Sequence, residues 1–161
     1  MPNLSDDVRA QYNGAFATIR GIAEVFPESK WLEPHADAYY IPGRIAYHLA
    51  AFIDRQLGGG SEDPDFASKL PYGNWMEATA ETLPDKKAFL SYYDEVIKRA
   101  QSSLAALDDD GVTAPIEPER AHFGKSQIGV HLYNMRELAA HSGELNKMLS
   151  EHGIDDVWVF K

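Results

Sequence analysis

Cysteine is absent from the 161 residues of this chain. Its absence excludes disulfide bonds, thiolate metal ligands and a cysteine nucleophile. It is also typical of proteins in the reducing cytoplasm, which is where we expect this one. Any metal ion would therefore have to be held by histidine, aspartate or glutamate side chains.

A basic cluster and a long hydrophobic run are also missing. The chain has 15 lysines and arginines against 25 acidic residues, so its formal net charge is −10. Because such a chain repels phosphate backbones, we expect no nucleic-acid partner. No apolar stretch approaches the roughly 20 residues of a membrane span, and residues 1–7 lack a signal-peptide pattern, so we expect no membrane partner.

The composition is otherwise that of one folded domain covering residues 1–161. Hydrophobic residues make up 44% of the chain, and 3 Trp, 8 Tyr and 7 Phe are spread along it. This content is too high for a disordered protein, and the length is that of one domain with a real core. Neither an internal repeat nor a low-complexity linker divides the chain.

Four stretches show the apolar spacing of amphipathic helices. Capping or helix-breaking residues stand at their ends, among them Ser5 or Asp6, Pro42, Asp85 and Ser126. The four stretches are residues 5–25, 42–57, 86–107 and 127–152. We therefore predict an all-α fold, a four-helix bundle with long connections, whose helices need not pack in simple up-and-down order.

The segments around these helices carry further expectations. Gly14 and Gly21 lie inside the first helix, where each costs up to ~1 kcal/mol against alanine, so a neighbouring helix is expected to pack closely there. Residues 61–84 are rich in proline, glycine and acidic residues. They are long for a structureless loop, which predicts a short helix around 74–82 or a cover over a functional site. The apolar tail, residues 157–160, is expected to fold back on the helices.

Two histidines lie on the apolar faces of separate helices. His48 follows Ile45 by three residues, and His141 shares the face of the neighbouring leucines on the last helix. Glu137 lies one turn before His141, so these two side chains can converge on one ion with bonds of roughly 2.0–2.2 Å. His48 would be a third ligand and would leave one side of the ion open. The alternative is that each ring is hydrogen-bonded in the core without a metal.

Such a set suits a divalent ion, and Zn, Ni, Mn and non-haem Fe all remain open. His131 also projects inward, but it lies ten residues from His141, about 15 Å along the helix axis. It is therefore a core residue or a group that supports the ligands from behind. Arg44, one turn before His48, is either a partner of Glu137 or an exposed helix charge.

No other catalytic pattern competes with this set. The chain shows no Ser-His-Asp order and no dinucleotide fingerprint. The run Gly58-Gly59-Gly60-Ser61 follows a helix rather than a strand and lacks the lysine of a phosphate-binding loop, so it is interpreted as a helix stop.

The segment Arg-Glu-Leu-Ala-Ala-His-Ser-Gly-Glu-Leu-Asn at 136–146 resembles the last-helix signature of the DinB-like metal-binding four-helix bundles, Arg-His-x-x-x-His-x-Gly-(Gln/Glu)-Leu-Asn. The segment around His48, Arg-Ile-Ala-Tyr-His-Leu-Ala-Ala-Phe-Ile-Asp at 44–54, resembles the second-helix signature of this superfamily. Trp158, after a glycine-containing loop, is also similar. The resemblance covers most of the chain in helix order and length.

The resemblance implies His48, Glu137 and His141 as metal ligands. Glu137 departs from the pattern, which has histidine there, and this departure means either a carboxylate ligand or a degenerated site. Characterised relatives include metal-dependent transferases and isomerases that use low-molecular-weight thiols, in which the ion lowers the thiol pKa. The resemblance thus implies a thiol and an electrophile as partners.

Three functions stay open: a metal-dependent thiol S-transferase or related lyase or hydrolase, a metal- or small-ligand-binding module without turnover, and a purely structural bundle. We also expect a homodimer, because bundles of this family often pair. Four aromatic residues are candidates for its interface: Tyr39, Tyr40, Trp75 and Tyr92.

Overall fold

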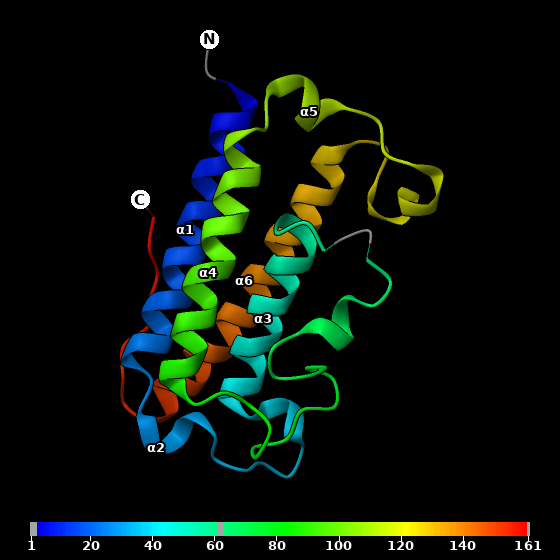
Figure 1. Ribbon diagram of the computed structural model, residues 1–161. Helices are drawn as coiled ribbons and strands as arrows, with labels where there is room; N and C mark the ends of the chain where they lie inside the picture. Colours follow the sequence, from blue (N-terminus) through cyan, green and yellow to red (C-terminus); the bar gives the residue numbers. More distant parts are fainter. Residues whose placement is uncertain (1–2, 61–62, 161) are drawn as a thin grey trace.

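The chain folds as an all-helical protein, so the all-α part of the predicted fold is confirmed. A computed structural model describes residues 3–60 and 63–160 (Figure 1). Its long helices are α1 (Leu4–Val25), α3 (Pro42–Leu57), α4 (Lys86–Ala105) and α6 (Gln127–Glu151). The shorter elements are α2 (Glu28–Trp31), α5 (Asp109–Thr113) and the 3₁₀ turns η1 (Ala38–Tyr40), η2 (Phe66–Lys69) and η3 (Pro118–Phe123). Within the described ranges the extended pairing is limited to one isolated bridge between Pro115 and Ser126.

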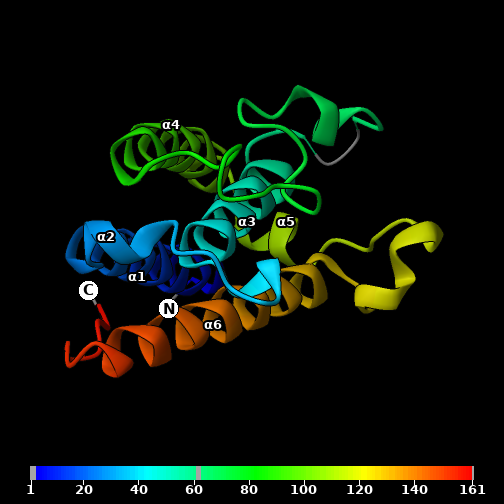
Figure 2. The same ribbon diagram turned by 90° about the horizontal axis from the view of Figure 1, so that it is seen from below.

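The four long helices lie side by side, and each contacts two of the others. Helix α1 packs against α4 and α6, and α3 packs against the same two helices; Figure 2 shows the arrangement along the helices. One stripe of each helix enters the shared core, as amphipathic spacing requires. Fully buried members include Tyr12, Ile19, Ile45, Leu49, Phe89, Tyr93, Leu138 and Leu149. None of the helices in the described ranges combines the length and apolar character needed to cross a bilayer.

The helix boundaries mostly follow the local signals of the sequence. Pro42 stands in the first turn of α3, and the Asp85 carboxylate accepts a hydrogen bond from the backbone N–H of Ala88 at the start of α4. The predicted cap of the first helix was wrong. Asn3 precedes α1, whereas Ser5 is buried inside it with its backbone N–H bonded to Asp109. The free N–H of Ser5 in the first turn of α1 is thus satisfied by a tertiary contact with Asp109.

The C-terminal tail, rather than a helix, lies against the glycines of α1. A Cβ atom at Gly14 would be 3.0 Å from the backbone oxygen of Val159, and one at Gly21 would be 2.8 Å from a methyl group of Val157. The Val159 N–H bonds to the Thr18 hydroxyl. Figure 1 shows the tail running beside α1. The expected close approach is present, but its partner is an extended segment because the tail folds back as predicted.

The connection after α3 forms no helix at 74–82, so that alternative was wrong. Instead, residues 63–85 pack on the outer side of α3 through a second apolar cluster that includes Tyr47, Leu70 and Leu83. The Tyr47 hydroxyl donates to the Gly73 carbonyl and accepts from the Tyr72 N–H. The segment is therefore held by a small core and by hydrogen bonds, as a cover over α3 would be.

The buried face of α6 is partly polar in its first half. Leu132, placed on the apolar stripe by its spacing, is 64% exposed, whereas His131 and Asn134 are buried. The Tyr12 hydroxyl lies 3.0 Å from His131 Nδ1 and accepts a hydrogen bond from the Asn134 amide. Because these bonds satisfy most of the buried polar atoms, α6 tolerates a polar stripe where an apolar one was predicted.

Candidate metal centre

The fold brings His48, Glu137 and His141 together. His48 comes from α3, Glu137 and His141 come from α6, and these two helices pack directly against each other. One donor atom from each residue lies within 4.8 Å of the donor atoms of the other two. All three residues are half-buried. This is the group of ligand-type side chains that the sequence predicted, and it joins His48 to residues 89 and 93 positions further along the chain.

His141 lies between two carboxylates. Its Nε2 is 3.4 Å from Glu137 Oε2, and its Nδ1 is 2.8 Å from Glu144 Oε2. Two ligands bound to one ion at roughly 2.1 Å in a tetrahedral arrangement stand roughly 3.4 Å apart, so the first pair already has ligand spacing. A neutral ring that donates its Nδ1–H to Glu144 directs the Nε2 lone pair towards the Glu137 oxygen. Two acceptors then face each other, an arrangement that a cation would satisfy.

Glu144 and Tyr39 are site residues that sequence reasoning missed. The Tyr39 hydroxyl lies 3.0 Å from His141 Nδ1 and 3.2 Å from Glu144 Oε2. Burial, followed by the Glu144 charge, raises the pKa of Tyr39 to about 12, so it stays a neutral donor. Carboxylates that orient a metal-ligating histidine in this way are common. Glu144 could have been found from its i+3 spacing to His141, whereas Tyr39 is brought in by the chain before α3.

His48 is held in the neutral state that a ligand needs. Its ring packs against Trp75, with the ring centroids 3.9 Å apart, and its Nδ1 is buried without a partner among the described side chains. Burial, followed by the nearby His141 and Arg44, lowers the pKa of His48 to about 4. A buried polar nitrogen without a hydrogen bond is costly, and a bound ion is one way to offset that cost.

The residues present therefore fit a divalent ion. Two imidazoles and one carboxylate form a donor set for Zn, Ni, Mn or Fe, and the orphaned His48 nitrogen and the Glu144-oriented His141 ring support it. The contacts of His141 are also compatible with the metal-free alternative. A protonated His141 would donate one N–H to Glu144 and the other towards Glu137. Metal analysis distinguishes these two states.

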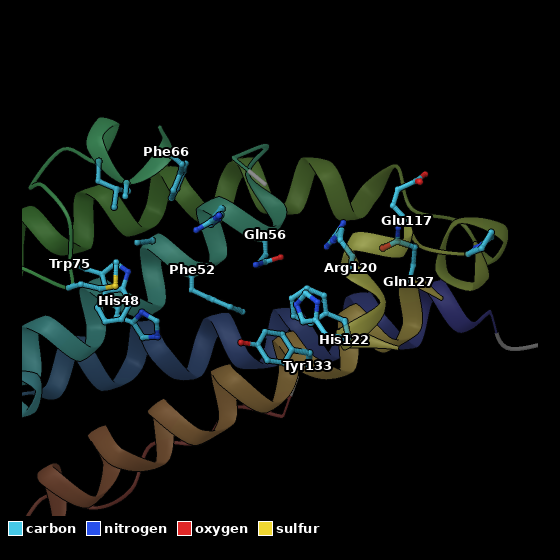
Figure 3. Close-up of a pocket in the computed structure, with 17 residues that line it drawn as sticks. His48, Phe52, Gln56, Phe66, Trp75, Glu117, Arg120, His122, Gln127 and Tyr133 are labelled. Atoms are coloured by element: carbon cyan, nitrogen blue, oxygen red, sulfur yellow. The ribbon is translucent and has the colours of Figure 1, made fainter. Parts of the chain in front are cut away.

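A cavity of about 710 Å³ opens beside His48. Its walls come from α3, from the connections on either side of η2 and η3, and from the start of α6. Figure 3 shows His48 and Trp75 at one end and Tyr133 further along the wall. Burial, followed by the charge of Glu137 and a hydrogen bond to it, raises the pKa of Tyr133, so its hydroxyl stays protonated beside this candidate ligand. A small molecule in the cavity would thus reach the His48 side of the candidate site.

The other predicted site residues lie elsewhere. Arg44 neither contacts Glu137 nor extends freely into solvent. Its guanidinium donates to the backbone carbonyls of Trp75 and Met76, which fixes the segment that covers His48. His131 contacts Tyr12 and belongs to the core.

The remaining histidines are separate from the triad. His122 lines the far part of the 710 Å³ cavity. His35 and His152 line a second cavity, of about 430 Å³, which Glu144 also borders.

The aromatic residues suggested for a dimer interface are mostly not on an open surface. Tyr39 contacts His141, Trp75 contacts His48, and the Tyr92 hydroxyl bonds to Asp54. Tyr40 is exposed, at 44%. The homodimer stays a prediction, but the residues proposed for it have other contacts.

Fold and site together define a class, an all-α protein with a candidate His-Glu-His metal centre beside a small-molecule cavity. Comparison with known proteins adds nothing to this class, since the chain matches no protein-family model, no curated protein and no solved structure. The DinB-like resemblance stays a prediction from the segments around His48 and His141 and from Trp158.

Proposed function

We propose that this protein is a DinB-like four-helix bundle that binds a divalent metal ion and acts as a metal-dependent thiol S-transferase. The observation that carries the proposal is the convergence of His48, Glu137 and His141 within 4.8 Å at the end of a cavity. A bound divalent ion would lower the pKa of a small-molecule thiol and thereby supply a thiolate at neutral pH.

The side chains of the site have distinct tasks in this proposal. Glu137 contributes a negative charge that favours a divalent cation over a proton, and Glu144 with Tyr39 fixes the orientation of His141. Trp75 covers His48 and limits the access of water from that side. Tyr133 lines the cavity and, through its hydrogen bond to Glu137, would help to orient that carboxylate.

Metal content and stability give the first test. Protein purified without a histidine tag is expected to contain close to one divalent ion per chain by mass spectrometry. Because the folded chain alone presents the site, added Zn or Ni should raise the melting temperature of metal-stripped protein. Absence of both effects would leave His141 hydrogen-bonded to Glu144 without a metal and end the proposal.

A thiol and electrophile screen tests the reaction itself. Metal-loaded protein is mixed with a panel of low-molecular-weight thiols and a chromogenic aryl halide, and thioether formation is followed by absorbance. The control is the His141→Gln variant, which keeps a polar side chain but loses the ligand. Turnover that needs both the metal and His141 supports a transferase. Metal binding without turnover on any thiol would reduce the protein to a binding module.

A further inference from the structure

The cavity beside His48 carries a charge pattern that the metal site does not use. Its lining includes Arg55 from α3 and Arg120 from η3, against one carboxylate, that of Glu117. The whole chain has a net charge of −10. Two arginines in one cavity of so acidic a protein create a local site for an anion on a surface that otherwise repels anions.

One of the two arginines, Arg120, lies at the end of the cavity away from the candidate ligand His48. Figure 3 shows His48 and Trp75 at one end of the cavity and Arg120 with Gln127 at the other. Phe52 and Gln56 lie between the two ends. The cavity is therefore elongated, with a metal-proximal end and a cationic end.

Arg120 is held in position at the cationic end. Its guanidinium lies over the Phe123 ring, 5.8 Å from the ring centroid, which limits its mobility. Among ion pairs whose two partners are both described, those of arginines involve Arg9, Arg20 and Arg99 and not Arg55 or Arg120. The planar guanidinium forms paired hydrogen bonds to carboxylate or phosphate groups, which makes it the common choice for binding such anions.

The walls of the cavity suit an apolar molecular body. Five aromatic side chains contribute to them: Phe52, Phe66, Trp75, Phe123 and Tyr133. The volume of about 710 Å³ is within the range of small-molecule sites, roughly 300–1,000 Å³. A ligand with an apolar middle and one acidic end matches the distribution of side chains.

We propose that the cavity binds a small organic anion, whose acidic group is held by Arg120 and attracted by the charge of Arg55, and whose opposite end reaches the His48 side of the metal site. This inference deepens the proposed function by naming the class of its substrate. Its test uses metal-free protein, so that a failure of anion binding and a failure of metal binding are seen separately.

The test compares two fluorescent dyes that differ in one charged group. These are 8-anilinonaphthalene-1-sulfonate and its uncharged analogue N-phenyl-1-naphthylamine, each titrated into the full chain in the presence of a chelator. Because a hydrogen bond to a charged group is worth roughly 1.5–3 kcal/mol, Arg120→Gln should weaken binding of the sulfonate about tenfold or more. Arg55 is exposed, so Arg55→Gln should weaken it by a smaller factor, about threefold. Neither change should alter binding of the neutral dye.

Lys87→Gln is the matched control, since it removes one positive charge from an exposed position on α4 that does not line the cavity. Circular dichroism establishes whether each variant is folded. If Arg120→Gln does not fold, Arg55→Gln still tests the proposal. Competition with phenylacetate and phenyl phosphate then shows which acidic group binds better. The proposal is overturned if the arginine variants behave like Lys87→Gln, if both dyes bind equally, or if neither acid displaces the sulfonate.

Discussion

At the scale of single residues, the candidate centre depends on how two glutamates face one histidine. Glu137 offers an oxygen 3.4 Å from His141 Nε2, and Glu144 accepts from Nδ1 at 2.8 Å. The first would bind the ion and the second would orient the ring. The two roles predict different responses to substitution.

Removal of Glu137 should weaken metal binding by at least ten- to a hundredfold, because even partners outside the ligand set contribute that much. Glu137→His keeps a ligand at the same helical position and should retain binding, with a shift towards metals that favour imidazole. Calorimetric titration of Glu137→Ala and Glu137→His with Zn and Ni measures both. Glu95→Ala, an exposed carboxylate on α4, is the control. Unchanged affinity in Glu137→Ala would remove this residue from the site.

Substitution of Glu144 should act through His141. Glu144→Gln keeps an oxygen that can accept from Nδ1 but loses the charge, so we expect metal affinity to fall by about tenfold. Glu144→Ala also loses the hydrogen-bond acceptor and should lower the metal affinity further. Competition with a chromophoric chelator measures the affinities. If both variants bind like the unmodified protein, Glu144 does not orient the ligand.

At the scale of the elements, the contact between α1 and the C-terminal tail explains the glycine in the middle of a long helix. Glycine normally costs a helix up to about 1 kcal/mol relative to alanine. At Gly14 an added methyl group would meet the Val159 carbonyl oxygen, a backbone atom. The tail therefore sets the side-chain size that α1 tolerates.

Two glycine substitutions separate helix propensity from this contact. Gly143→Ala in α6 adds a methyl group with no atom within 4 Å and should stabilise the protein by about 0.5–1 kcal/mol. Gly14→Ala should yield no such gain, because the tail must move. Urea unfolding gives the free energies, and Trp158 fluorescence reports on the tail. Equal stabilisation at both positions would show that the tail does not pack as described.

The segment 63–85 shows how a long connection becomes part of a site. Tyr47 and Arg44, both on α3, bind its backbone, and together they place Trp75 on His48. The expectation of a cover was thus closer to the structure than the expectation of a helix. Segments that carry function on a rigid scaffold are common, and here the scaffold is α3 itself.

At the scale of the whole molecule, a histidine buried in the core makes stability depend on pH. Burial lowers the pKa of His131, so the folded protein binds a proton there only at a pH below the ordinary value. The unfolded chain binds it at about 6.5. As pH falls through that value the unfolded state gains protons and the folded state does not, so stability decreases.

Between pH 7.5 and 5.5 this single site can lower the free energy of unfolding by at most about 1.4 kcal/mol. His131→Gln should remove this loss and retain an acceptor for the Tyr12 hydroxyl. Urea unfolding at the two pH values, in a chelator, measures the difference. His152→Gln at an exposed position is the control. If His131→Gln loses as much unfolding free energy between the two pH values as the unmodified protein, another group is responsible for the pH dependence.

Association of two copies stays a prediction at this scale. The large apolar side chains that are exposed include Leu132, Trp158 and Phe160, and they differ from the aromatic residues first suggested for an interface. Sedimentation at tens of micromolar is expected to show a dimer, and a monomer would contradict it.

The sequence by itself determined the long helices and two histidines on their inner faces. Period and capping are local properties, and for this reason α3 begins at Pro42 and α4 follows the Asp85 cap as predicted. Because a helix projects residues four apart to one side, the pairing of Glu137 with His141 was also readable.

The tertiary structure alone decided which distant groups meet these residues. Tyr39 reaches His141 from 102 positions away, Arg44 binds carbonyls of a connection rather than Glu137, and the tail, rather than a helix, lies on Gly14. Leu132 shows the same limit, since its spacing indicated an inward position as that of His131 did, but only His131 is buried. Apolar spacing indicates which face of a helix is buried, but the residues that contact that face are set by the packing of the whole chain.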